Sequence, residues 1–481
     1  MAAHKLSAWL VLPCVLSWSA CTSYDGPLVR AHVLAIDSDG RAYDPESGHP
    51  EAVAERVEHM LQQADTTLGK EPVRRLLIHV HGGLNDAAAS LATAQRASRR
   101  MLEEADPADR HYPLFVTWPS GFYESWTDYL LFVRQGRHAP VAGPLTAPIY
   151  LVSDAGSAVA DLPFNLLWQF ESDIQVGGKV AFDWDFMRMW NAADLVYETL
   201  ESDPVVRKQI RRGDYRRGFW TQAGRCVWYW TTLAPAIAMS MGLEWLGEGS
   251  WEGMLHRANN LFHAYDEFDV MTVGEGSAEV KAAVTTQPTG AFAELLYALA
   301  DHIARHPDVR YEIRLVGHSM GAIILNDALR FLHSEDVCRC RIRSPLPIRD
   351  IVYMAPACTI AEAAQSVVPF VEAHPESSFH LLTLHPLAEA EEVNAFGLVP
   401  RGSLLEWIDN FFTRPTGPQE RRLGKWVNAL QALHLFRSIQ SRMTVKAFGV
   451  EGDSKPQQHG DFNLCPFWRR SFWDPDGPLL W

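Results

Sequence analysis

Uninterrupted apolar runs alternate with helical patterns along much of this 481-residue chain. Strands that are apolar throughout must be covered on both faces, which is typical of a mostly parallel sheet with helices packed against each side. We therefore expect an α/β fold with a largely helical insertion. The strands are predicted at residues 28–37, 74–81, 112–118, 313–316, 348–357, 379–386 and 443–450, and the helices at residues 51–68, 87–104, 292–305, 361–372, 404–412 and 423–436 and from residue 320 onward.

Residues 122–289 interrupt this alternation and form the predicted insertion. The segment is rich in Trp, Pro and Gly, and residues 226–243 are an uncharged stretch of 18 residues just after an arginine-rich segment. Such a stretch fits a cap that lies on a lipid surface, a buried helix pair or a membrane span. The α/β core is accordingly assigned to residues 28–121 and 290–481, and residues 122–289 to an inserted cap or membrane-interfacial region.

The first 20 residues resemble an export signal, because a short basic start precedes an uncharged apolar stretch that is too short to span a bilayer comfortably. The sequence Ser19-Ala20-Cys21 is similar to the cleavage site of bacterial lipoproteins, although Trp18 stands where Leu is usual. We expect a protein of the bacterial envelope, either anchored through a lipid on Cys21 or periplasmic or secreted. The net charge of −15 argues against nucleic-acid binding.

Ser319 stands between two glycines where an apolar run gives way to a helical pattern, in the sequence GHSMG of residues 317–321. A nucleophilic serine needs an exposed hydroxyl, a base within hydrogen-bond reach and donors for the developing oxyanion. A tight strand–turn–helix reversal presents the hydroxyl, and small flanking residues let the strand and the helix approach each other. We therefore predict that Ser319 is a nucleophile and that the backbone N–H of Met320 is one oxyanion donor.

The sequence HVHGGLN, residues 79–85, ends an earlier apolar run and is the expected source of the second donor. Ligands bind at the carboxyl ends of parallel strands, and glycines there let backbone N–H groups approach a substrate. Gly83 or Leu84 is the expected donor. His79 and His81 also match the start of a zinc-hydrolase signature, but that signature continues to an Asp-His pair, whereas two glycines follow here. We expect no metal and no organic cofactor, and His79 is predicted to be a core residue.

The general base is expected in a loop beyond the last predicted strand. His459 has this position, in a polar loop some 140 residues after the serine. His385 and His374 are the alternatives.

The carboxylate that orients this histidine is expected after the strand at residues 379–386. Glu389 comes first there and is the predicted acid, with Glu391, Glu392 and Asp409 as further candidates. Its role is to hold the imidazole tautomer and to stabilise the imidazolium ion. Glutamates in a sequence such as AEAEE are also common as solvated groups at a helix start.

The HGG loop, the GHSMG turn, a following carboxylate and a late histidine resemble the α/β-hydrolase superfamily of serine hydrolases. The sequence FVTWPSG, residues 115–121, is also similar to a Phe-x-Trp-Pro-Ser signature in a less characterised bacterial branch of that superfamily. The resemblance covers about residues 28–121 and 291–462. It implies a triad of Ser319, His459 and an acidic residue, and a cap inserted between core strands. Caps often follow the sixth strand, whereas this insertion precedes the serine.

The expected reaction is hydrolysis of a carboxylic ester through an acyl-enzyme on Ser319. The Trp-rich insertion and the export signal favour lipid esters or other apolar esters as substrates, and contact with a membrane surface. Two alternatives stay open, since the same fold supports different functions. The triad could transfer the acyl group to an acceptor other than water, or the scaffold could serve as a membrane-anchored interaction or assembly protein without catalysis.

Overall fold

The computed structural model describes most of the chain between residues 25 and 474. The described residues are 25–69, 71–104, 106, 109–134, 137–181, 192–212, 215–216, 219–263, 289–333, 345–390, 392, 399–448, 450–451 and 455–474. The predicted signal segment 1–20, Cys21 and Glu391 lie outside these residues.

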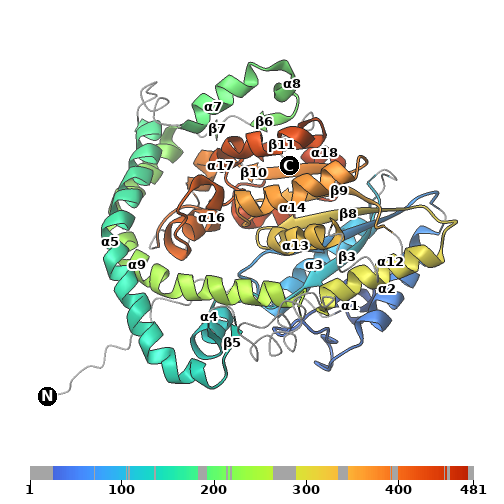
Figure 1. Cartoon of the computed structure of the whole chain (residues 1–481). Coiled ribbons are helices and arrows are strands. Elements are labelled where there is room, and N and C mark those ends of the chain that lie inside the picture. Colours follow the sequence, from blue (N-terminus) through green and yellow to red (C-terminus); the bar gives the residue numbers. More distant parts are fainter. Residues whose placement is uncertain are drawn as a thin grey trace, which may run out of the picture.

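Eight strands form one central sheet (Figure 1). Their order is β1-β3-β2-β8-β9-β10-β11-β6, and every neighbouring pair is parallel. The predicted α/β class is therefore confirmed. The strands are β1 (Val33–Ala35), β2 (Arg74–Val80), β3 (Tyr112–Thr117), β6 (Ile210–Arg212), β8 (Tyr311–His318), β9 (Ile348–Met354), β10 (Ser378–Leu384) and β11 (Met443–Phe448), and short ladders join β4 (Val133–Arg134) to β5 (Arg137–His138) and β7 (Tyr215–Arg216) to β12 (Val450–Glu451).

Helices pack on both faces of the sheet. From β2 the chain passes through α3 (Ala87–Leu102) to β3, whereas from β8 it passes through α13 (Gly321–His333) to β9, in the opposite direction across the sheet. Because such crossovers are right-handed, α3 and α13 lie on opposite faces. On the α13 side, α13 packs against α14 (Ile360–Ala373), and α12 (Ala291–Arg305) packs against α2 (Val53–Leu68).

The neighbouring strands β2 and β8 form a switch point in this topology. The chain leaves these two strands in opposite directions, so the helices that follow them diverge and leave a crevice beyond the strand ends. Open α/β sheets bind their ligands in such a crevice. The HGG loop follows β2, and Ser319 follows β8.

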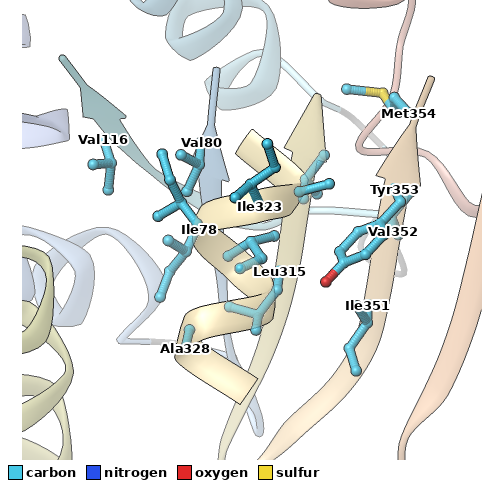
Figure 2. Close-up of a cluster of buried hydrophobic side chains, with 14 of the residues drawn as sticks. Ile78, Val80, Val116, Leu315, Ile323, Ala328, Ile351, Val352, Tyr353 and Met354 are labelled. Carbon is cyan, nitrogen blue, oxygen red and sulfur yellow. The ribbon is translucent and has the colours of Figure 1, made fainter. Parts of the chain in front are cut away.

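Figure 2 shows the part of the main hydrophobic core that lies between the sheet and α13. Ile78 of β2, Leu315 of β8 and Ile351 of β9 are fully buried, and Ile323 of α13 covers them. The apolar runs in the sequence are thus the strands that are covered on both faces, where burial of apolar surface is the main source of stability.

Two long helices make up most of the described insertion, α5 (Ala142–Ala181) and α9 (Phe219–Asn260). They pack against each other and lie at one side of the sheet in Figure 1. The C-terminal part of α9 contacts α4 (Phe122–Leu131) and places Trp251 and Met254 in the main core. Residues 226–243 lie within α9. In the part of the chain that the structure describes, no helix combines the length and apolarity needed to cross a membrane.

The insertion also contributes to the sheet. Strand β6 lies within it and pairs with β11, so it forms the edge of the sheet opposite β1. Two short helices of the insertion precede β6, α7 (Ala192–Glu201) and α8 (Pro204–Arg207). Strand β6 was not predicted, because its three residues are too few for an alternating or apolar pattern to be recognised.

The N-terminal segment differs from the prediction of a strand over residues 28–37. Residues 26–32 form α1 (Gly26–His32), and only β1 is extended. The side chain of Asp25 accepts a hydrogen bond from the N–H of Leu28 at 3.3 Å, and a proline stands in the first turn. Both features start helices, and they outweigh the alternating pattern.

The last third of the chain follows the predicted order, with irregular helices. Residues 404–412 form α16 (Leu404–Trp407) and the π-helix η3 (Ile408–Phe412), and the next helical segment is α17 (Trp426–Ala432) followed by the 3₁₀ helix η5 (Leu433–Arg442). The remaining elements are α15 (Pro386–Ala390), η4 (Pro418–Glu420), η6 (His459–Leu464) and α18 (Arg470–Trp473).

Candidate active site

Ser319 occupies the turn between β8 and α13 with a backbone φ of +52°. This left-handed conformation is uncommon for residues with a side chain and costs about 1–2 kcal/mol. The neighbouring strand holds the turn in place. The N–H of Ser319 donates to the carbonyl of Met354 at 2.9 Å, and the carbonyl of Ser319 accepts the N–H of Ala357 at 3.0 Å. The structure thus has a tight strand–turn–helix reversal at Ser319.

Glycines allow this turn to press against the end of β2. A Cβ atom at Gly321 would lie 2.1 Å from the carbonyl oxygen of Val80, and one at Gly82 would lie 2.7 Å from the Cβ of Ser319. At Gly317 a Cβ would lie 2.9 Å from a backbone nitrogen of α13. These glycines are therefore required by close approach of the backbone, as the sequence pattern predicts.

The loop after β2 offers one of its two predicted donors. Leu84 has a φ of +64°, and its N–H donates to the carbonyl of Ser120 at 2.9 Å. By contrast, the N–H groups of Gly83 and Met320 have no acceptor among the described residues. Gly83 rather than Leu84 is thus free to pair with Met320 as an oxyanion donor.

Two residues without a predicted role hold this loop. The side-chain amide of Asn85 donates to the carbonyls of Gly82 and Gly83, each at 3.1 Å. The backbone N–H of Ser120 in turn donates to the carbonyl of Asn85 at 3.0 Å. Asn85 belongs to the sequence HGGLN and Ser120 to the sequence TWPSG. Both motifs were noted in the sequence, but the sequence does not show that these two loops are hydrogen-bonded to each other.

The hydroxyl of Ser319 is buried, in contrast to the exposed hydroxyl that the turn was expected to present. The residue is 1% exposed, and Oγ has no hydrogen-bond partner among the described residues. The C-terminal part of α9 lies close to the same loop, because the sulfur of Met254 would be 3.2 Å from a Cβ at Gly83. A substrate can reach Oγ only if some of the covering side chains move.

His459 lies beside the residue that precedes Ser319. Its ring centroid is 5.0 Å from that of His318, and Nε2 of His318 donates to the His459 carbonyl at 3.0 Å. Both ring nitrogens of His459 are buried and have no partner within the described part of the chain. Burial, together with the nearby His318, holds the pKa of His459 well below its usual value. His459 is therefore a neutral imidazole at neutral pH, and in this buried state it is a weaker base than a solvated histidine.

Glu392 is the candidate carboxylate that contacts His459. Its Oε2 accepts the backbone N–H of His459 at 2.9 Å. Burial raises the pKa of Glu392 to about 7, although this hydrogen bond acts in the opposite direction. Among the residues that the structure describes, no carboxylate is hydrogen-bonded to the ring of His459.

The predicted acid, Glu389, and the alternative Asp409 have other partners. Glu389 is buried and accepts the hydroxyl of Ser403 at 2.9 Å, and burial raises its pKa well above the usual value. Asp409 accepts the backbone N–H of Arg422 at 3.1 Å and its guanidinium Nε at 3.3 Å. The structure does not bring either side chain to the ring of His459, and Glu391 lies outside the described residues.

The alternative bases are also placed elsewhere. His385 follows β10, and its Nδ1 accepts the N–H of Leu387 at 3.1 Å. His374 follows α14, where its ring stacks on Phe370 with centroids 4.1 Å apart. Since α14 leads into β10, His374 lies toward the amino ends of the strands, away from Ser319.

The two histidines of the HVH sequence serve the core. His79 is buried between the rings of Phe115 and Phe467, as a core residue. At His81, Nδ1 donates to the carbonyl of Gly82 at 2.6 Å, and Nε2 accepts the N–H of Trp118 at 3.0 Å. Both nitrogens of His81 are engaged, so the ring has no free lone pair to offer a metal ion here.

Comparison of the chain with family models, with curated proteins and with solved structures found no match.

Proposed function

We propose that this chain is a serine hydrolase of the α/β-hydrolase type that cleaves carboxylic esters through an acyl-enzyme on Ser319. The observation that carries the proposal is the tight strand–turn–helix reversal with a positive φ at Ser319, next to the HGG loop. A left-handed backbone at a residue with a side chain costs about 1–2 kcal/mol, and such strain clusters at active sites.

The order of the parts along the chain supports the same proposal. The HGG loop follows β2, Ser319 follows β8, the carboxylate candidates follow β10, and His459 follows β11. Because these strands are parallel, all four segments leave the same edge of the sheet. Hydrolases with a serine on a strand–helix elbow carry their nucleophile, acid and histidine in this order.

In the proposed reaction, Oγ of Ser319 attacks the ester carbonyl carbon while a ring nitrogen of His459 takes the hydroxyl proton. The N–H groups of Met320 and Gly83 stabilise the negative charge on the carbonyl oxygen. The intermediate then expels the alcohol, which takes the proton from His459. Water repeats these steps on the acyl-enzyme and releases the acid.

We assign the orienting role to Glu392, because its carboxylate already binds the segment that carries His459. Hydrogen bonds between catalytic groups are often long before substrate binds and shorten in the complex. A rotation of the Glu392 side chain from the backbone N–H toward the imidazole would complete the triad. No metal or organic cofactor takes part in this reaction.

The insertion favours apolar esters presented at a lipid surface. Along α5, four apolar side chains are spaced so that they share one side of the helix, and each is more than half exposed: Leu145, Ile149, Val152 and Val159. On α9, Trp220 is 83% exposed. A helix side of this kind suits the boundary between water and lipid, where tryptophan is also common. We therefore propose contact with a membrane surface, in an exported protein.

Labelling with a fluorophosphonate tests the nucleophile. We expect the wild-type chain to be labelled and to hydrolyse p-nitrophenyl esters, and Ser319→Ala to lose both activities, with hydrolysis reduced at least about a thousandfold. Ser438→Ala is the matched control, because Ser438 is exposed and lies in η5. Equal labelling of the wild type and Ser319→Ala would show that another residue reacts.

Two outcomes would favour the alternatives. If wild type is inert toward the probe and toward a series of esters, with and without liposomes, the scaffold serves binding rather than catalysis. If added alcohols divert the acyl group from water to new esters without loss of total turnover, the same site is an acyltransferase. A rate that rises with liposomes would support lipid esters as substrates.

A further inference from the structure

A second group of reactive side chains lies at the other end of the sheet. Asp65 of α2 faces His302 of α12 and His306, which ends that helix, beside Tyr311 at the start of β8. Strand β8 has 8 residues, so this group lies roughly 25 Å from Ser319. It takes no part in the proposed hydrolase reaction and does not depend on it.

The three side chains are arranged like the ligands of one ion. His302 lies in the last turn of α12, and His306 caps that helix four residues later. Their side chains lie on the same side of the helix end, with ring centroids 4.5 Å apart. Oδ2 of Asp65 is 3.1 Å from Nε2 of His302. One nitrogen or oxygen from each residue lies within 4.8 Å of the others. Ligand atoms around tetrahedral zinc are about 3.4 Å apart, so small side-chain rotations suffice.

His306 has a second contact that orients it, and a carboxylate lies near the second nitrogen of His302 beyond hydrogen-bond distance. Nδ1 of His306 donates to the carbonyl of His302 at 2.9 Å, which leaves the lone pair on Nε2. Nδ1 of His302 is 3.8 Å from Oε2 of Glu58, and Nε2 faces Asp65. Metal-binding histidines commonly direct their other nitrogen to a carbonyl or a carboxylate in this way.

Both oxygens of the Asp65 carboxylate have partners, and those on Oδ1 lie outside the histidine pair. Its Oδ1 accepts the hydroxyl of Tyr311 at 3.0 Å and pairs with Arg74. Oδ2 faces His302, so an ion would take the place of the hydrogen bond between them. The cluster is reachable from solvent, because the side chain of Asp65 is 21% exposed and His306 is half-buried, whereas His302 is buried. Arg74 weakens the attraction for a cation, and Glu58 offsets little of this because its Oε2 is 2.6 Å from Nη2 of Arg305.

We propose that Asp65, His302 and His306 bind a divalent transition-metal ion, with zinc the best match to two imidazoles and one carboxylate. Zinc sites with three protein ligands take water as the fourth ligand. Bound here, the ion would replace the hydrogen bond between Asp65 and His302, and it would clamp α2 to α12 at the amino end of β8. This site stabilises the fold rather than the reaction.

Titration of the metal-free full chain with zinc chloride tests the site, by calorimetry and by the melting temperature. We expect one ion per chain to bind at this site and to raise the melting temperature, since an ion that binds only the folded state stabilises it. His306→Gln should weaken binding at least tenfold and abolish the thermal shift. His434→Gln is the matched control, because exposed His434 also donates Nδ1 to a nearby backbone carbonyl.

A second variant keeps the test decisive if His306→Gln folds poorly. Glu58→Gln removes no ligand, but it removes the charge behind His302 and the ion pair of Glu58 with Arg305, so we expect binding about 10–100-fold weaker. The proposal is overturned if the wild-type chain takes up no zinc, or if His306→Gln and Glu58→Gln bind zinc as tightly as His434→Gln. In either case the cluster is only a hydrogen-bond network that joins α2, α12 and β8.

Discussion

Backbone strain is concentrated where three neighbouring strands end. Within the described residues, the non-glycine positions with positive φ are Leu84, Ser319 and Ala355. Leu84 lies in the loop after β2, and the other two directly follow β8 and β9. Such conformations cost about 1–2 kcal/mol each and persist only where the surrounding structure fixes them. The strained residues therefore mark the edge of the sheet that carries the candidate triad.

At the residue scale, Gly321→Ala tests the close approach of the turn to β2. The new Cβ would lie 2.1 Å from the backbone oxygen of Val80, which cannot move without disturbing the strand. We expect the free energy of unfolding to fall by about 1–3 kcal/mol and ester hydrolysis to be lost. Gly417→Ala is the control, because its Cβ would meet no atom within 4 Å. Equal stability of both variants in chemical denaturation would show that the turn is looser than described.

At the scale of elements, the two long helices of the insertion differ in what covers them. The C-terminal part of α9 joins the main core through residues such as Trp251, and it lies next to the HGG loop. Helix α5 packs against α9 but leaves Leu145 75% exposed and Ile149 67% exposed. Exposed apolar surface along a helix marks a contact with a partner or with lipid. Helix α9 thus contacts the HGG loop of the candidate site, and α5, which packs on α9, carries the exposed apolar surface.

Liposome binding tests this surface. We expect the wild-type chain to sediment with vesicles of phosphatidylcholine and phosphatidylglycerol, and the double variant Leu145→Ser, Ile149→Ser to bind several-fold less, because binding scales with buried apolar area. Leu102→Ser is the control, since Leu102 is an exposed leucine at the end of α3, which lies outside the insertion. Wild-type chain that stays in the supernatant would contradict a lipid surface as the partner.

At the scale of the whole molecule, buried imidazoles couple stability to pH. Burial lowers the pKa of His79 and of His111 to about 3, and that of His81 and of His318 to about 4. The unfolded chain binds protons at these residues near pH 6.5, whereas the folded chain does not. Their contribution to stability is therefore complete above pH 6.5 and is lost as the pH falls toward the folded values. The buried carboxyl of Glu392 acts in the opposite direction, because its folded pKa is raised.

His79→Leu isolates one of these groups. At pH 5, each fully buried neutral imidazole should lower the free energy of unfolding by about 1–2 kcal/mol relative to pH 7.5. We expect the pH dependence of urea denaturation to be flatter by this amount in His79→Leu than in wild type. His434→Leu, at an exposed position, should keep the wild-type slope. Identical slopes in all three proteins would mean that His79 is protonated in the folded state.

Short-range patterns in the sequence determined the fold class and the tight turn at Ser319. The apolar runs became β2, β3, β8, β9, β10 and β11, because a strand buried on both faces must be apolar along its whole length. The spacing of Gly317 and Gly321 around Ser319 indicated a tight turn, because only small residues fit against α13 and against β2 there. These features depend on neighbours in the chain, so they could be predicted without the fold.

Tertiary structure alone decided which distant side chains meet. It joined Glu392 to His459, although Glu389 was the predicted acid, and it engaged the N–H of Leu84 with Ser120. It also buried the hydroxyl of Ser319 and gathered Asp65 with His302 and His306, a cluster that no motif in the sequence announces. Such contacts are set by how helices and loops pack across the sheet, and local hydrophobic periodicity carries no information about them.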